Sequence, residues 1–210
     1  MRKSSVNNIL SKAGGLYAGA RGFSLVEMLI AMAVGMVVLG AMYGVFNIQS
    51  KTLGNQEEIV AMQQSVRAGM DMMAREIGMA GYNPAGATLV GVTYDTTQLR
   101  IMADLNGDTD TGDENEDIVY KHYNSSEYPY QIKRKTGGGD FQPFVENVQF
   151  FNFEYLKSDG ITSATTSAEV RQIRITITGR TAKPDSSYTT NGGYRTYTLT
   201  SVIAPMNLAF

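Results

Sequence analysis

The sequence predicts an α+β fold in which one long N-terminal helix packs on an antiparallel β-sheet. A helical pattern runs through residues 23–80, first as a nearly uncharged apolar stretch and then as an amphipathic stripe. After Pro84 the hydrophobic period changes to two, and short runs rich in β-branched and aromatic residues follow. A helix laid over an antiparallel sheet buries the apolar face of each, so these two observations favour the same architecture.

The composition excludes several classes of function. The 210 residues suit one globular domain with an appendage. The chain has no cysteine, which excludes disulfides and thiolate metal sites, and its single histidine, His122, lies in a strand pattern without a partner. Nor does the sequence contain a phosphate-binding glycine loop or a nucleophile elbow. We therefore expect a protein that is not an enzyme, with His122 packed or facing solvent.

Residues 23–46 form the apolar part of the helix and contain one charged residue, Glu27, in 24 positions. A helix of that length extends about 36 Å, enough to cross a hydrocarbon core about 30 Å thick. Residues 1–22 carry four basic and no acidic side chains, whereas the rest of the chain carries 14 basic and 20 acidic ones. The positive-inside rule then predicts one crossing, with the chain after residue 51 outside the cytoplasm.

A cleavable secretory signal also begins with basic residues followed by an apolar stretch. The apolar run here is too long for such a signal, and no Ala-x-Ala-like site follows it. The small residue that could mark a cleavage site precedes the run instead, as Gly22.

Residues 21–30 read Arg-Gly-Phe-Ser-Leu-Val-Glu-Met-Leu-Ile. This segment resembles the processing site of type IV prepilins and type II secretion pseudopilins. The resemblance implies that prepilin peptidase cleaves between Gly22 and Phe23, and that Phe23 becomes the N-methylated end of the mature chain. Residues 1–22 would then be a leader peptide.

Glu27 is the one carboxylate in the apolar stretch. A charged group at the centre of a membrane span costs about 2.5 to 3.5 kcal/mol on the insertion scale, so it is retained where it finds a partner. The resemblance implies that this partner is the freed amine of Phe23 on a neighbouring subunit, which makes Glu27 an assembly residue. The alternative is a glutamate that extends to the interface near the helix end.

The helical pattern continues as an amphipathic segment over residues 47–83. Apolar residues recur at spacings of three and four, as on one face of a helix; they are Ile59, Met62, Val66, Met70, Met73 and Ile77. Gly78, Gly81 and Pro84 end the pattern. This stripe must pack on the rest of the chain.

Residues 84–210 form the expected head domain, an antiparallel sheet. The alternation is clearest where Ile173, Ile175 and Ile177 share one face, so we expect one face buried and the other wet. The expected strands are residues 88–94, 98–103, 118–123, 130–135, 144–156, 170–178 and 194–203.

Later segments add a narrower resemblance. Residues 145–156, 159–160, 170–177 and 202–208 are similar to the PilW-type minor pilins and the J-type minor pseudopilins. The resemblance implies a minor subunit that primes or caps a type IV pilus or a type II secretion pseudopilus. It implies as partners other minor subunits, the major pilin and the inner-membrane assembly platform. The protein would first span the inner membrane once, with its head in the periplasm, and then enter the filament, at its tip.

A second function remains open on the same fold, namely a membrane-tethered adhesin or a DNA-uptake head. Such a head needs an exposed aromatic or basic patch. The run Lys133-Arg134-Lys135 is too small a footprint for nucleic acid, so we do not expect nucleic-acid binding.

An acidic segment, residues 104–117, holds seven carboxylates in 14 positions. Oxygen-bearing side chains alternate at its start, as in a loop that binds Ca²⁺; they are Asp104, Asn106, Asp108 and Asp110. The glycine and the final glutamate of an EF-hand are not at their required positions. The segment is either a distinct calcium loop or a solvated acidic turn between two strands.

Overall fold

The computed structural model describes residues 22–86, 88–125, 127 and 129–208. Of the expected leader peptide, only Gly22 is among them, so the rest of that prediction lies outside the described residues. The chain divides into two compact units, Met1–Lys51 and Thr52–Phe210.

One helix, α1 (Leu25–Met79), forms as the sequence predicts. The end of the helix follows from local chemistry. At the C-terminal end, Gly81 adopts a φ of 80°, a conformation that costs glycine little, and its N–H donates to the carbonyl of Met102 (2.9 Å). Within the unit Thr52–Phe210, the predicted stripe is the face that is buried: Met62, Val66, Met70, Met73 and Ile77 are all buried.

The strands are antiparallel, which confirms the α+β prediction. They are β1 (Val92–Thr93), β2 (Leu99–Met102), β3 (Asp117–Tyr123), β4 (Gln131–Thr136), β5 (Gln142–Glu146), β6 (Val148–Leu156), β7 (Gln172–Arg180) and β8 (Thr196–Ile203). Two short 3₁₀ turns lie in the connections, Ser167–Glu169 and Asn191–Gly193.

These strands form two sheets where we expected one. Strands β1 to β5 make a five-stranded sheet in sequence order, and β6, β7 and β8 make a three-stranded sheet. The expected strand over residues 144–156 is divided at Asn147, which has a φ of 57°. Asparagine tolerates this left-handed conformation better than most residues, and it turns the chain from β5 in one sheet to β6 in the other.

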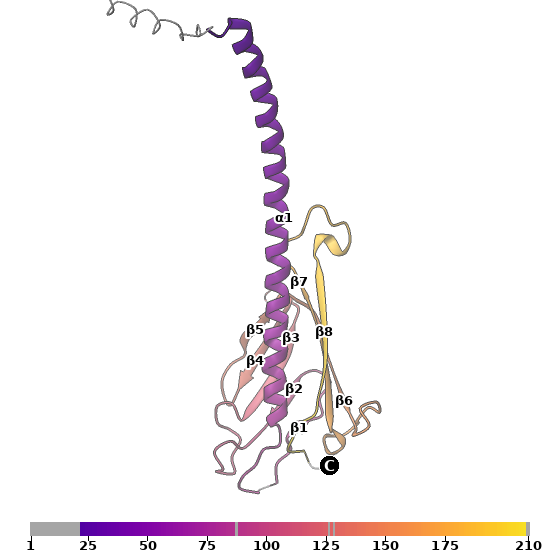
Figure 1. Ribbon diagram of the computed structural model, residues 1–210. Coiled ribbons are helices and arrows are strands. Elements are labelled where there is room, and N and C mark those ends of the chain that lie inside the picture. The colour runs from indigo at the N-terminus through magenta and orange to yellow at the C-terminus, as the bar shows by residue number, and fades with distance from the viewer. Residues whose placement is uncertain (1–21, 87, 126, 128, 209–210) are drawn as a thin grey trace, which may run out of the picture. The chain divides into compact units, whose positions relative to one another are not determined.

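The second half of α1 packs between the two sheets. Figure 1 shows β4 and β5 on one side of it and β8 on the other. The core contains the alternating residues Ile173, Ile175 and Ile177 of β7 together with Met73 and Ile77 of α1.

Two glycines permit the close approach of α1 to each sheet. A Cβ added at Gly69 of α1 would lie 2.4 Å from Cγ2 of Val145 in β5. A Cβ added at Gly179 of β7 would lie 2.5 Å from Cγ2 of Val66. Both distances are shorter than real carbon contacts, so a side chain at either position would force the facing valine to move.

One charged residue of α1 is also buried in this unit. Glu76 is 9% exposed, and its carboxylate accepts a hydrogen bond from the hydroxyl of Tyr120. Arg134 of β4 forms an ion pair with the same carboxylate, with 2.9 Å between Nη2 and Oε1. Burial and the negative charge of Glu76 raise the pKa of Tyr120 far above its ordinary value, so its hydroxyl keeps its proton and donates.

Candidate functional site

The first candidate site is the start of α1. Gly22 has open space around it, and Phe23 is 86% exposed. Ser24 and Glu27 exchange hydrogen bonds: the N–H of Glu27 donates to Oγ of Ser24 (3.2 Å), and the N–H of Ser24 donates to Oε2 of Glu27 (3.3 Å). This reciprocal pair is a capping box, which satisfies two N–H groups that a helix start leaves free.

The capping box gives Glu27 a role that the sequence analysis missed. Its signal was present, since Ser24-x-x-Glu27 directly precedes a long apolar run. A negative charge in the first turn is also favourable beside the positive end of the helix dipole. The structure thus shows Glu27 as a cap within the chain, and its predicted pairing with an amine of another subunit stays a prediction.

In the described part of this unit, residues 22–51, the helix exposes an apolar surface on all sides. By length and composition α1 is able to cross a membrane, and no residue of its most apolar window is buried. Side chains here include Met36, which is 72% exposed, and Phe46, which is 66% exposed. A helix that is apolar all round is normally covered by lipid or protein.

The second candidate site is the acidic loop between β2 and β3. Asp104 is 2% exposed, and its carboxylate accepts hydrogen bonds from the N–H groups of Gly107 (2.6 Å) and Thr109 (3.1 Å). Asp110 turns toward its own backbone and accepts from the N–H groups of Thr111 and Gly112.

Asn106 connects three carboxylates of this loop. Its side-chain amide donates to Asp113 (2.9 Å) and to Asp108 (3.1 Å). Its backbone N–H donates to Oε1 of Glu116 (3.2 Å), which also accepts from the N–H of Leu105 (2.7 Å). The structure therefore groups the predicted Asn106 and Asp108 with Asp113 and Glu116, two residues that we had not selected.

These contacts are hydrogen bonds and not a preformed metal cluster. Across the described part of the chain, no three histidine, cysteine, aspartate or glutamate side chains are arranged to hold a metal ion. The oxygen-bearing side chains do alternate in the sequence. In the structure, however, most of their oxygens accept hydrogen bonds from N–H groups of the loop itself.

The basic run and the histidine are parts of the sheet. Lys133 is 7% exposed, and Arg134 pairs with Glu76, so neither contributes to an exposed basic patch. The ring of His122 in β3 is partly buried. Its Nε2 atom lies 2.9 Å from the carbonyl oxygen of Val148. Among the described residues, no titratable side chain forms a hydrogen bond with His122.

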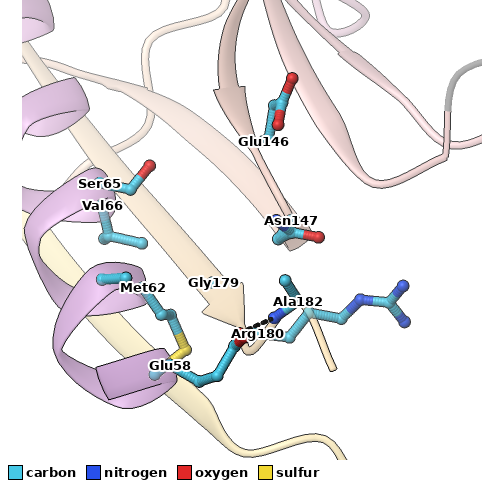
Figure 2. A pocket seen from close by; sticks show the side chains of 10 residues that line it. Glu58, Met62, Ser65, Val66, Glu146, Asn147, Gly179, Arg180 and Ala182 are labelled. Carbon is cyan, nitrogen blue, oxygen red and sulfur yellow. Dashed lines mark hydrogen bonds between the residues drawn. The ribbon is translucent and has the colours of Figure 1, made fainter. Parts of the chain in front are cut away.

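A cavity of about 180 Å³ lies between α1, the end of β5 with the following Asn147, and the end of β7. Figure 2 shows Met62 and Val66 beside the backbone of Gly179, and Glu58 reaching to the N–H of Ala182 (3.2 Å). Arg180 extends away from this space in Figure 2. The volume is below the range of about 300 to 1,000 Å³ that is usual for small-molecule sites, so we assign no ligand to it.

The comparisons with known proteins concern mainly the first site. Residues 18–43 match the prokaryotic N-terminal methylation motif. A type IV-like pilin from Thermus thermophilus aligns over 70% of this chain and 98% of that chain, with a TM-score of 0.43 and 14% identity. That likeness is too remote to carry an argument. Comparison with curated proteins gave no match.

The matched motif includes Gly22, Phe23 and Glu27. It coincides with the point at which α1 begins and with the apolar surface that follows. The chain therefore carries an N-terminal methylation motif at the start of a helix that is long and apolar enough to anchor it in a membrane.

Proposed function

We propose that this chain is a minor pilin or pseudopilin subunit of a type IV pilus or a type II secretion pseudopilus. It is made as a precursor, cleaved by prepilin peptidase between Gly22 and Phe23, and methylated at Phe23. The observation that carries the proposal is the methylation motif over residues 18–43, which lies at the start of the exposed apolar half of α1.

The apolar surface of α1 supports a two-stage role. Before assembly, lipid covers this surface and holds the subunit in the inner membrane, with the head in the periplasm. During assembly, other subunits replace the lipid: the major pilin, other minor subunits and the assembly platform. The head, which has its own core of α1 and two sheets, stays outside and forms the tip.

The test of processing is Gly22→Ala. We expect this variant to remain an uncut precursor, because the peptidase requires the small residue before the cut, and an intact-mass measurement on the membrane fraction detects the retained residues 1–22. Gly35→Ala is the matched control, since Gly35 lies inside the helix with open space around it. Normal loss of the leader in Gly22→Ala would contradict the proposal.

Glu27 can be tested apart from its capping role. Glu27→Ala removes the charge and the cap, and we expect normal membrane insertion but impaired incorporation into filaments. Glu27→Gln keeps an acceptor for the capping box and removes only the charge, whereas Ser24→Ala weakens the box and keeps the charge.

Incorporation is measured by the amount of subunit in sheared filaments. If the charge pairs with an amine of another subunit, Glu27→Gln fails and Ser24→Ala assembles. If Glu27 acts only as a cap, the two variants show the opposite result.

The alternative function, a tethered adhesin or DNA-uptake head, requires an exposed basic or aromatic patch. Lys133 and Arg134 do not supply the basic patch, because Lys133 is buried and Arg134 pairs with Glu76. We therefore prefer the assembly function.

A further inference from the structure

Arg180, the last residue of β7, has its guanidinium between two aromatic rings. Its Cζ lies 3.5 Å from the centre of the Tyr130 ring and 4.2 Å from the centre of the Tyr194 ring. Both are distances of a guanidinium stacked on a ring face, and two rings this close to one atom must lie on different sides of it. The two faces of the guanidinium are therefore covered, and its edge, where the N–H groups point, is what a ligand can reach.

In the described residues, no carboxylate forms an ion pair with this guanidinium. Its Nε is buried and has no hydrogen-bond partner. Glu146 lies in the same part of the head, but its carboxylate points away from Arg180 in Figure 2. The charge of Arg180 is thus partly removed from water without a counterion, a state that an incoming anion relieves.

A second arginine, in the connection between β7 and β8, shows what completes such an arrangement. Arg195 stacks on Tyr188, with 4.8 Å between Cζ and the ring centre. Its Nε and Nη2 donate to the carboxylate of Asp185 at 3.1 and 2.9 Å. Arg180 has aromatic support from two rings and lacks the carboxylate. A carboxylate fits the edge of a stacked guanidinium because the two planar groups can form parallel hydrogen bonds in one plane.

The backbone holds both tyrosines in place. Tyr130 has a φ of 55°, which is rare for a bulky residue, and its carbonyl accepts a hydrogen bond from the N–H of Val148 (2.7 Å). Asn191 has a φ of 51°, and its side-chain amide donates to the carbonyl of Tyr194 (3.2 Å). Backbone conformations of this kind cluster at binding sites, where they fix a side chain before the ligand arrives.

We propose that Arg180 binds a carboxylate of another protein chain, with Tyr130 and Tyr194 as positioning residues. The source of the carboxylate rests on the proposed function, and it is an acidic side chain of a neighbouring subunit. Gly179, the residue before Arg180, lies against Met62 and Val66 of α1. In the sequence, these two residues come soon after the apolar half of the helix, which other subunits cover under the proposed function.

A carboxylate suits this position better than a phosphate. A phosphate group carries more than one negative charge at neutral pH and is bound best by several positive charges together. The nearby cations in the chain are already paired: Lys183 with Glu58 at 3.8 Å, and Arg195 with Asp185 at 2.9 Å. Arg180 therefore offers one planar cation, which matches a carboxylate with one negative charge.

The first test uses NMR spectroscopy of the full chain in detergent, with sodium acetate as the probe and sodium chloride at equal ionic strength as the reference. We expect acetate to shift the backbone N–H signals of Thr181 and Tyr194 in a saturable way that chloride does not reproduce. Arg180→Lys keeps the charge and loses the planar edge. It should weaken acetate binding by about tenfold, as expected for one lost hydrogen bond between charged groups.

Arg67→Lys is the matched control, because Arg67 is exposed and stacks on one ring, that of Tyr197, at 5.9 Å. It should bind acetate as the unaltered chain does. Tyr130→Leu should weaken binding although Arg180 is still present, whereas Tyr130→Phe keeps the ring and should restore it. A response to acetate that does not saturate overturns the proposal, and so does equal weakening by Arg67→Lys. Tighter binding of inorganic phosphate than of acetate overturns the choice of a carboxylate.

The second test asks whether the carboxylate belongs to a neighbouring subunit. Arg180→Glu places a negative charge where a carboxylate should bind, and it should lower the amount of subunit in sheared filaments by at least about tenfold. Arg67→Glu should assemble normally. If Arg180→Glu also assembles normally, a neighbouring subunit is not the source of the carboxylate. If the unaltered chain is absent from filaments, the proposed function fails, and the acetate titration still decides whether Arg180 binds a carboxylate.

Discussion

The two halves of α1 share one backbone conformation and differ in what covers their side chains. In the first half, over residues 25–51, large apolar residues are exposed on every side; Met36 is 72% exposed. In the unit that begins at Thr52, Met73 and Ile77 are 0% exposed, because two sheets of the same chain enclose them. The pattern of apolar residues in the sequence predicts this difference. The first half is apolar all round and needs a partner outside the chain, whereas the second half has one apolar stripe and needs one packing face.

The comparison teaches that apolar residues on this helix act at different stages. Those after Thr52 stabilise the fold of the head. Those before it are not buried in that core, and under the proposed function they set the affinity for lipid or for other subunits. Variants on the two halves should therefore separate head stability from membrane retention and assembly.

Truncation of a buried methionine should show the largest effect. Met73→Ala leaves a cavity in the core and should lower the free energy of unfolding of the head by about 2 to 5 kcal/mol. Met36→Ala makes the same chemical change on the exposed half and should leave that free energy unchanged. Urea unfolding of the detergent-solubilised chain measures both, and equal losses would remove the distinction between the halves.

Loss of the buried charge of Glu76 should have the next largest effect on the stability of the head. Glu76→Gln leaves Arg134 without its ion-pair partner, and Arg134 has a side chain only 15% exposed. Loss of one partner of a buried pair costs about 3 to 5 kcal/mol, and we expect the lower end because Arg134 keeps its bond to Asn115 and some contact with water. Glu57→Gln, at an exposed position of the same helix, is the control. If both variants unfold at the same urea concentration, the Glu76 pair does not stabilise the head.

Much of this architecture could be predicted from the sequence, because it depends on local periodicity. The observed helix Leu25–Met79 lies within the expected 23–80, and β7 has the predicted alternation. The division into two sheets depends on the single φ of Asn147, which leaves the hydrophobic pattern of residues 144–156 unchanged. A periodic pattern therefore cannot reveal it.

The polar contacts were harder to predict for a related reason. Glu76 and Arg134 are 58 residues apart and meet only after α1 has packed on β4. In the acidic loop, the alternation of Asp104, Asn106, Asp108 and Asp110 suggested one set of neighbours. The irregular backbone brings Asn106 to Glu116 instead, ten residues away. At the helix start, the processing motif could be identified because it is local and has fixed offsets.

A matched pair of glycine variants should have smaller and opposite effects. Gly54→Ala, at a position with open space, should stabilise the helix by up to about 1 kcal/mol, the propensity difference between the two residues. Gly69→Ala gains the same propensity but forces a Cβ against Val145, and overpacking costs about 1 to 3 kcal/mol. We expect a net loss of about 1 kcal/mol for Gly69→Ala, measured by urea unfolding. A gain at both positions would show that α1 is not held closely against β5.

The smallest effect concerns pH and a carboxylate in the connection between β7 and β8, Asp185. Ser187 donates its hydroxyl and its N–H to Asp185, and Arg195 donates to the other carboxylate oxygen, which lowers the pKa of Asp185 from 3.8 to about 2. Because the pKa is depressed in the folded chain, the contribution of Asp185 is complete above pH 3.8 and is lost as the pH falls toward 2. Asp185→Asn should thus lower stability at pH 5, and the difference from the unaltered chain should shrink between pH 4 and pH 2.

Asp140→Asn, at an exposed position, should follow the unaltered chain throughout. Urea midpoints across this range measure the effect. An unchanged pH dependence in Asp185→Asn would mean that these hydrogen bonds persist in the unfolded chain or do not form, and the acid sensitivity of the head would then belong to other carboxylates.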